Sequence, residues 1–160
     1  MDMLRQAQVA LSGLMLMSGA AVADQGDVIL EVTGQIADGP AALDRATLQT
    51  LPSVTINTST VVTDGVHAFS GVLMRDLLDS LNAEGDQVMA TALNEYAVDI
   101  PMSDFYEYDV ILATTMDGKE LVREDKGPLW IVYPRDDHEA LQDIRYDYRW
   151  VWQLRRLDVR

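Results

Sequence analysis

The sequence contains no cysteine in its 160 residues. This absence excludes disulfide bonds, zinc sites built from thiolates, and catalysis by a cysteine–histidine pair. It also excludes a lipid anchor attached through cysteine. Histidine is nearly absent, with only His67 and His138. Because no nucleophile elbow, phosphate-binding loop or paired-histidine motif is present, the sequence offers no familiar catalytic motif.

Basic residues are scarce: 12 Lys and Arg stand against 26 Asp and Glu, for a formal net charge of -14. Nucleic acids and anionic membrane surfaces require basic patches, so we expect neither as a partner. An acidic surface that keeps the protein soluble is the simplest explanation of the charge. Hydrophobic residues make up 48% of the chain, which suits one globular domain with a sizeable core.

Long apolar runs are few, and the clearest one lies near the N-terminus. Arg5 gives a weakly positive start, residues 9–17 form a mostly apolar core, and Ala21-Val22-Ala23 is a small-residue cleavage signal. We therefore predict a signal peptide over residues 1–23 and a mature domain over residues 24–160. The apolar run is too short for a membrane anchor, and no arginine pair precedes it. These features predict a periplasmic protein, exported by a Sec-type signal, with no membrane insertion after cleavage.

Short strands dominate the rest of the chain. Apolar and β-branched residues at every second position make residues 54–62 the clearest strand. Further strands are expected at residues 28–32, 87–92, 96–100, 110–116, 119–122, 129–133 and 154–159, and helices at residues 44–51, at 71–83 after Ser70 as N-cap, and as one turn near Ser103. This mixture predicts an α+β fold with a mixed, mostly antiparallel β-sheet and two or three short helices.

Aromatic residues make up only 7% of the chain, yet four stand at alternate positions near its end: Tyr146, Tyr148, Trp150 and Trp152. If this segment is extended, their rings share one face. Arginines concentrate in the same region, at Arg145, Arg149, Arg155, Arg156 and Arg160. Planar rings and guanidinium groups are typical of binding surfaces. A core strand with ion pairs to the acidic body explains the pattern equally well.

A buried strand is expected where the turn Lys126-Gly127-Pro128 leads into Leu-Trp-Ile-Val-Tyr and a second proline. This stretch and three others resemble, in order and spacing, the molybdopterin-binding oxidoreductase domain of the sulfite oxidase family. The four phrases are Phe69–Leu78, Tyr96–Pro101, Asp109–Ala113 with Met116–Leu121, and Gly127–Pro134, and Val151–Val159 is similar to the family's last strand. The resemblance implies the sulfite-oxidase-type fold.

Three departures from the family pattern concern its cofactor. Family members hold molybdenum by a pterin dithiolene and one cysteine thiolate, whereas the corresponding region here, Ile56–Thr60, offers hydroxyls, which are hard, weak substitutes. Members commonly place a lysine near the cofactor phosphate, where this chain has Trp152. Exported members usually travel folded, whereas a Sec-type signal implies export unfolded and empty. The resemblance makes molybdopterin the candidate cofactor, but the departures predict that none is bound.

The candidate ligand-binding residues are those that would flank the family's cofactor cleft. They are Thr58, Ser59, Thr60, His67, Arg149, Trp150 and Trp152. For His67, a loop position without a site is the simpler explanation. The run Asp136–Glu139 has metal-ligand residue types, but consecutive residues cannot all face one ion, so we expect an exposed acidic loop there. No metal site and no catalytic residue is predicted.

These observations favour a non-catalytic periplasmic binding protein that presents a small ligand, or itself, to a partner protein such as a membrane sensor or an enzyme subunit. Two alternatives stay open. One is a molybdopterin-dependent oxidoreductase without the cysteine ligand. The other is a structural subunit of a larger complex, whose acidic face and arginine–aromatic patch form an interface.

Overall fold

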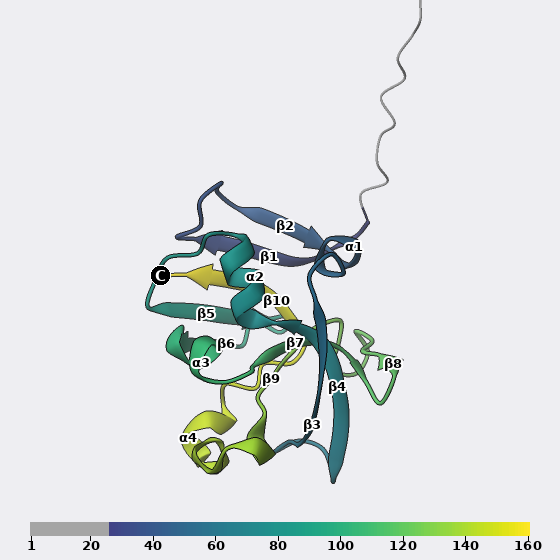
Figure 1. Ribbon diagram of the computed structural model, residues 1–160. Coiled ribbons are helices and arrows are strands. Elements are labelled where there is room, and N and C mark those ends of the chain that lie inside the picture. Colours follow the sequence, from purple (N-terminus) through teal and green to yellow (C-terminus); the bar gives the residue numbers. More distant parts are fainter. Residues whose placement is uncertain (1–25) are drawn as a thin grey trace, which may run out of the picture.

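The computed structural model describes residues 26–160 (Figure 1), so the predicted signal peptide lies outside the described residues. The helices of the described part are short, and none is long and apolar enough to cross a membrane. They are α1 (Arg45–Leu48), α2 (Met74–Ser80), α3 (Ser103–Glu107), α4 (Ile144–Asp147) and the 3-10 turns η1 (Arg135–Asp137) and η2 (Glu139–Gln142).

The first of two sheets, sheet A, brings the two ends of the described chain together. Its strand order is β2 (Ala41–Asp44), β1 (Val28–Gly34), β10 (Leu154–Val159), β5 (Gln87–Ala92) and β6 (Ala97–Pro101). β1 and β10 pair in parallel, and every other pairing among the described strands is antiparallel. The predicted α+β class with a mixed, mostly antiparallel arrangement is confirmed.

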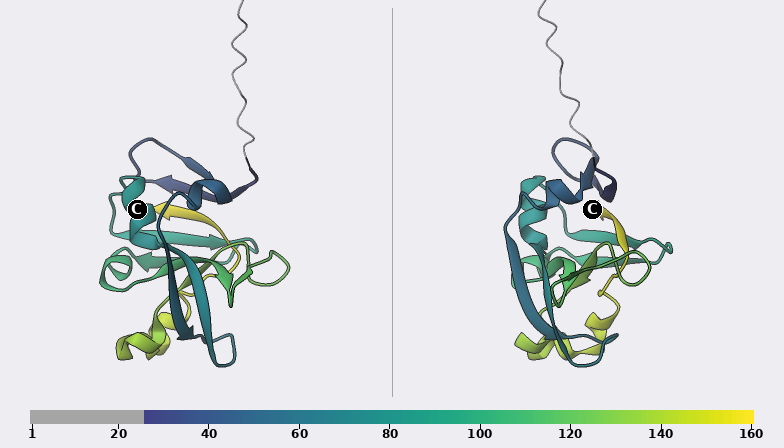
Figure 2. Two further views of the ribbon diagram at one scale, coloured as in Figure 1. Left: turned by 45° about the vertical axis from the view of Figure 1, so that its right-hand side comes forward. Right: turned by 90° about the vertical axis from the view of Figure 1, so that its right-hand side faces the viewer.

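The second sheet, sheet B, is built around a long hairpin. Its order is β3 (Ser53–Ser59), β4 (Val66–Leu73), β7 (Ile111–Met116) and β8 (Lys119–Glu120), with β9 (Trp130–Val132) continuing beside β7. β3 and β4 run at a steep angle to the strands of sheet A. The tip of the β3–β4 hairpin lies at the same end of the molecule as α4 (Figures 1 and 2). All three residues of β9 are buried, as the sequence predicted.

Residues 71–83 were predicted as one helix, and this prediction is wrong for its first three residues and for its last three. β4 continues to Leu73, and α2 begins only at Met74. The cause is the pairing of β4 with strands on both sides. Gly71 permits this pairing, because a Cβ there would lie 1.9 Å from the carbonyl oxygen of Leu112. Ser70, predicted as an N-cap, instead bonds across the sheet to Thr55 (2.7 Å).

The aromatic segment near the C-terminus is not extended throughout, so its four rings do not share one face. Tyr146 lies in α4, and Tyr148 is the C-cap residue of this helix. The helix begins after Asp143, whose carboxylate accepts from the backbone N–H of Arg145 (2.9 Å). Asp is a preferred N-cap residue, so Asp143 is a feature of the sequence that indicates the start of α4.

Candidate functional site

The candidate residues at the end of β3 form one hydroxyl cluster that is held by η1. The Thr58 hydroxyl is fully buried, donates to the Ser59 carbonyl (3.1 Å) and accepts from the Asp136 N–H (3.2 Å). Ser59 donates both its hydroxyl (2.6 Å) and its backbone N–H (2.7 Å) to the Asp136 carboxylate. These bonds lower the pKa of Asp136, the Ser59 hydroxyl contributing most. The carboxylate of Asp136 therefore stays ionised beside the cluster.

The hydroxyls of this cluster do not fit the role of metal ligand that the resemblance gives to a cysteine thiolate in this region. Thr60 bonds to Thr63 (2.7 Å) and accepts from the Val62 N–H (3.1 Å), so all three candidate hydroxyls already have partners. To replace a thiolate, a hydroxyl oxygen would have to lose its proton, and the adjacent Asp136 anion opposes a second negative charge. Among the described residues, no group of three or more His, Asp or Glu side chains could hold a metal ion.

His67 lies opposite Thr58 in the β3–β4 register, but its ring bonds elsewhere. Its Nδ1 contacts the Asp117 carboxylate (2.6 Å), and its Nε2 contacts the Asp64 carbonyl (2.8 Å). Asp117 begins the turn between β7 and β8, and its other oxygen accepts from the Ala68 N–H (3.0 Å). His67 therefore joins the tips of two hairpins.

We expect an NMR titration to place the pKa of His67 above 6.5, because both ring nitrogens face acceptors, Asp117 contributing most. The interaction of protonated His67 with Asp117 stabilises the fold. Because the pKa of His67 is raised in the folded state, this stabilisation is complete below pH 6.5 and is lost as the pH rises through the raised value. The pKa of Asp117 is lowered from 3.8, so its contribution is lost only as the pH falls through the lowered value. In Asp117→Asn the pKa of His67 should return toward 6.5; an unchanged value contradicts this assignment.

Arg149 belongs to a second group, a buried charge network that we call the Asp104 network. Its members are Asp104, Tyr133 and Arg149. The guanidinium Nη1 and the Tyr133 hydroxyl (2.8 Å) both donate to Oδ2 of Asp104, which is only 4% exposed. Burial, and then the Asp104 carboxylate, raise the pKa of Tyr133 well above 10. The phenol therefore stays protonated and acts as a donor. The Arg149 guanidinium also lies 4.6 Å from the centre of the Tyr146 ring.

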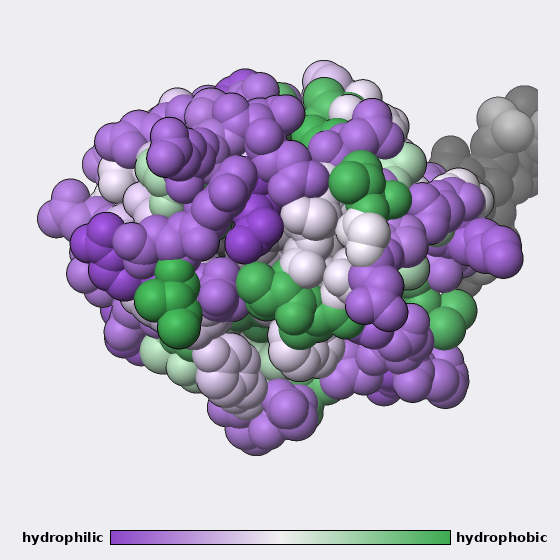
Figure 3. All heavy atoms as spheres, turned by 90° about the horizontal axis from the view of Figure 1, so that it is seen from below, coloured by the Kyte–Doolittle hydropathy of each residue, from purple (hydrophilic) through white to green (hydrophobic). Residues whose placement is uncertain are grey.

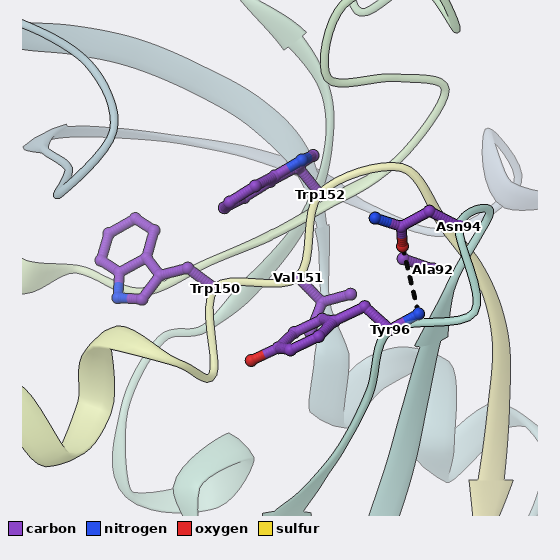
Figure 4. A pocket seen from close by; sticks show the side chains of 6 residues that line it. All are labelled: Ala92, Asn94, Tyr96, Trp150, Val151 and Trp152. Carbon is purple, nitrogen blue, oxygen red and sulfur yellow. Dashed lines mark hydrogen bonds between the residues drawn. The ribbon is translucent and has the colours of Figure 1, made fainter.

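Trp150 and Trp152 follow this network, and they line a hollow of about 330 Å³ (Figure 4). Trp150 is 1% exposed and lies with its ring 5.9 Å from Tyr133 and 6.5 Å from Trp130. Trp152 is 39% exposed and is held at its backbone by a bridge to Trp130. One tryptophan is therefore part of the core, whereas the other presents its ring at the surface.

The opposite wall of the hollow comes from the turn between β5 and β6, which the sequence analysis did not single out as a site. The rings of Tyr96 and Trp152 lie on opposite sides of the hollow (Figure 4). The Tyr96 hydroxyl donates to the Tyr148 carbonyl (3.2 Å), which fixes the ring. The side-chain oxygen Oδ1 of Asn94 accepts from the backbone N–H of Tyr96 (3.1 Å). The side-chain amide nitrogen of Asn94 is therefore left to donate at the rim of the hollow.

The seven candidate residues therefore lie in separate places. Thr58, Ser59 and Thr60 are bound to η1 and to their own loop, His67 to the β7–β8 turn, and Arg149 to the Asp104 network. Trp150 and Trp152 line the same hollow. What this arrangement offers chemically is a slot between two aromatic rings with an amide donor, and it is suited to a flat molecule that carries an acceptor.

The end of the molecule that carries α4 and the β3–β4 tip exposes further apolar side chains. Val61, Val62, Val66 and Ile144 are all exposed. Seen from this end, apolar residues form several patches among polar ones (Figure 3).

Comparisons with known proteins agree with the fold. A family model described as the oxidoreductase molybdopterin binding domain matches residues 19–137. No curated protein matches the chain. Among solved structures, the chain is similar to the sulfane dehydrogenase SoxCD from Paracoccus pantotrophus, with a TM-score of 0.62 and 19% identity, covering 81% of this chain and 37% of that chain. The chain thus spans well under half of that longer protein chain, and the likeness is one of fold. The chain belongs to the oxidoreductase molybdopterin binding domain family.

Proposed function

We propose that this protein is a non-catalytic, periplasmic binding module of the molybdopterin-binding family, and that it binds a small planar ligand in the hollow between Trp152 and Tyr96. The observation that carries the proposal is the state of the hydroxyl cluster of Thr58, Ser59 and Thr60, which lies in the region where the resemblance implies the family's metal-binding cysteine. Its oxygens are already hydrogen-bonded and stand beside the ionised Asp136. A family scaffold without the cysteine ligand favours a role other than molybdenum chemistry.

The geometry of the hollow supports a flat ligand. Tyr96 is 47% exposed and Trp152 is 39% exposed, so both rings have faces that a ligand can cover. Offset-stacked aromatic contacts contribute about 0.5–1.5 kcal/mol each beyond the burial of area. The amide of Asn94 supplies one directional hydrogen bond at the rim. The apolar part of the wall, from Ala92 and Val151, excludes water from the ligand's edge.

The two alternatives follow from other features. Membership of the family favours a molybdopterin-dependent oxidoreductase that lacks the cysteine. The exposed apolar residues near the β3–β4 tip favour a structural subunit that docks to a partner protein. The location rests on the signal-like pattern of residues 1–23.

A direct test of the proposal is to purify the protein from periplasm, to measure molybdenum by mass spectrometry and to measure released pterin by fluorescence. We expect neither in a stoichiometric amount. Stoichiometric molybdenum would overturn the binding-module proposal in favour of the oxidoreductase. Fractionation of cells that express the full chain tests the location, and retention of the protein in the cytoplasm contradicts it.

Ligand binding is tested by the fluorescence of the tryptophans during titration with a panel of planar aromatic compounds, free pterin among them. For a compound that binds, Trp152→Ala should weaken affinity roughly two- to tenfold, the equivalent of one lost stacking contact. Tyr106→Ala removes a similarly exposed ring on α3, outside the hollow, and should leave affinity unchanged. Equal affinities of the wild type and Trp152→Ala would remove the hollow from consideration.

A further inference from the structure

From Ser53 to Asn57, the outer edge of β3 has no charged residue, proline or bulge of its own that would protect it as an edge strand. Edge strands expose unpaired backbone groups, and proteins guard them with charges, prolines, bulges or very short length. No charged residue occurs between Arg45 and Asp64. β3 lies within this interval, is seven residues long, and pairs with β4 in an unbroken register.

The other sheet edges of the described chain are protected. β2 is four residues long and ends at Asp44, and β6 contains Asp99 and Pro101. β8 consists only of Lys119 and Glu120. β9 is a fully buried strand of three residues. β3 is therefore the exception in a chain whose net charge is -14.

The direction of the free backbone groups follows from the bond between Ser59 and Asp136. The Ser59 N–H binds the Asp136 carboxylate (2.7 Å), so it points away from β4. Residues at every second position of an antiparallel strand point their N–H and C=O groups the same way. The backbone groups of Ser53, Thr55 and Asn57 therefore also point outward. Ala68, the partner of Asn57 in β4, shows the same alternation. Its carbonyl accepts from the Asp117 N–H and therefore points toward β7 and away from β3, as expected if the backbone groups of Asn57 point away from β4.

We propose that this edge pairs with the β3 edge of a second copy of the chain, antiparallel and about a two-fold axis at Thr55. Thr55 then faces Thr55 of the other copy, and Ser53 faces Asn57. Each of these pairs exchanges two backbone hydrogen bonds. The two B sheets become one continuous sheet with the β3 strands at its centre, because β3 is the end strand of sheet B.

Both faces of the strand are self-complementary in this register. On the solvent face, the facing side chains are Thr, Ser and Asn, which are small, uncharged and able to bond to one another. On the core face, Val54 of one copy faces Ile56 of the other, and both are half-buried residues packed against the core. Two copies that each carry a charge of -14 repel one another over most of their surface, so the uncharged edge is the favourable place for contact.

Asp136 sets the length of this contact. Its carboxylate occupies the outward N–H of Ser59, so pairing stops after Asn57. The symmetric arrangement uses the same edge on both copies, and it therefore closes as a dimer. This inference is independent of the ligand hollow, which lies in another part of the fold.

Sedimentation velocity of the purified protein over a concentration series tests the proposal. We expect a monomer–dimer equilibrium. Thr55→Lys places like charges on the two-fold axis and should raise the dimer dissociation constant at least about tenfold, the equivalent of about 1.4 kcal/mol. Thr55→Ser keeps the register and should preserve the dimer. Ala97→Lys adds the same charge on β6, the edge of the other sheet, and should also leave the dimer intact.

Hydrogen exchange provides a second readout. The amides of Thr55 and Asn57 should exchange slowly at concentrations at which the dimer forms, and quickly after dilution or in Thr55→Lys. An unchanged melting temperature of dilute Thr55→Lys shows that the monomer still folds. A wild type that is monomeric at all concentrations, or a dimer that persists in Thr55→Lys, overturns the proposal.

Discussion

Replacing Arg149 by methionine should destabilise the protein by about 3–5 kcal/mol, because the loss of one partner leaves the other buried charge uncompensated. The side chains of Arg149 and Asp104 are 14% and 6% exposed. Water therefore cannot replace most of the hydrogen bonding and charge compensation that the guanidinium gives to the Asp104 carboxylate. Methionine retains an apolar side chain similar to the methylene stem of arginine. The loss of stability therefore measures the contribution of the guanidinium charge and its hydrogen bonds. Urea unfolding should show a lower midpoint with an unchanged slope.

The matched control for this variant is Arg145→Met. Arg145 is paired with Asp143 in an equally well-formed contact, but its side chain is 79% exposed. Exposed ion pairs contribute about 0–1 kcal/mol, so Arg145→Met should be nearly neutral. The double variant Asp104→Asn with Arg149→Met should recover part of the loss, since no buried charge is left alone. Equal destabilisation by the two arginine variants would contradict the burial argument.

Trp150→Ala should lower the free energy of unfolding by about 3–5 kcal/mol, as expected for a large buried ring. Trp150 fills the space between Trp130 and Tyr133 at the base of the hollow. Its Nε1 is buried without a hydrogen-bond partner among the described residues. Because the substitution also removes this unpaired donor, the loss should lie near the lower end of the range.

Trp152→Ala, two positions later, should change stability by less than about 1 kcal/mol, because its partly exposed ring contributes less burial. The same substitution should weaken ligand binding, as set out above. Thermal or urea unfolding of both variants separates the two roles. If Trp152→Ala destabilises as strongly as Trp150→Ala, the ring of Trp152 is part of the core and is not a binding surface.

The fold was largely readable because its signals are local. Period-two alternation indicated β3. The pair Asp117-Gly118 between two expected strands has the composition of a two-residue hairpin turn, and its φ angles of 51° and 75° are those of such a turn. The failure at residues 71–73 has a physical cause. The apolar residues there fit a helix stripe, whereas pairing of β4 on both sides depends on strands far away in the chain.

The site was less predictable, since its contacts join distant segments. Arg149 meets Asp104 across 45 residues of chain, and Ser59 meets Asp136 across 77. No spacing in the sequence shows such partners. Tyr96 was expected only as the first residue of a strand, Asn94 lies between two expected strands, and nothing local indicates that Tyr96 would stand opposite Trp152.

The position of β10 has a consequence for how the chain reaches its folded state. β10 lies in the middle of sheet A, between β1 and β5, so β1 and β2 have no wider sheet to join until residues 154–159 are available. A two-stranded hairpin alone is marginally stable in water. We therefore expect β1 and β2 to stay unpaired with the rest of sheet A until β10 is available. Non-local pairing of this kind predicts slow folding, which would be compatible with the predicted export in an unfolded state.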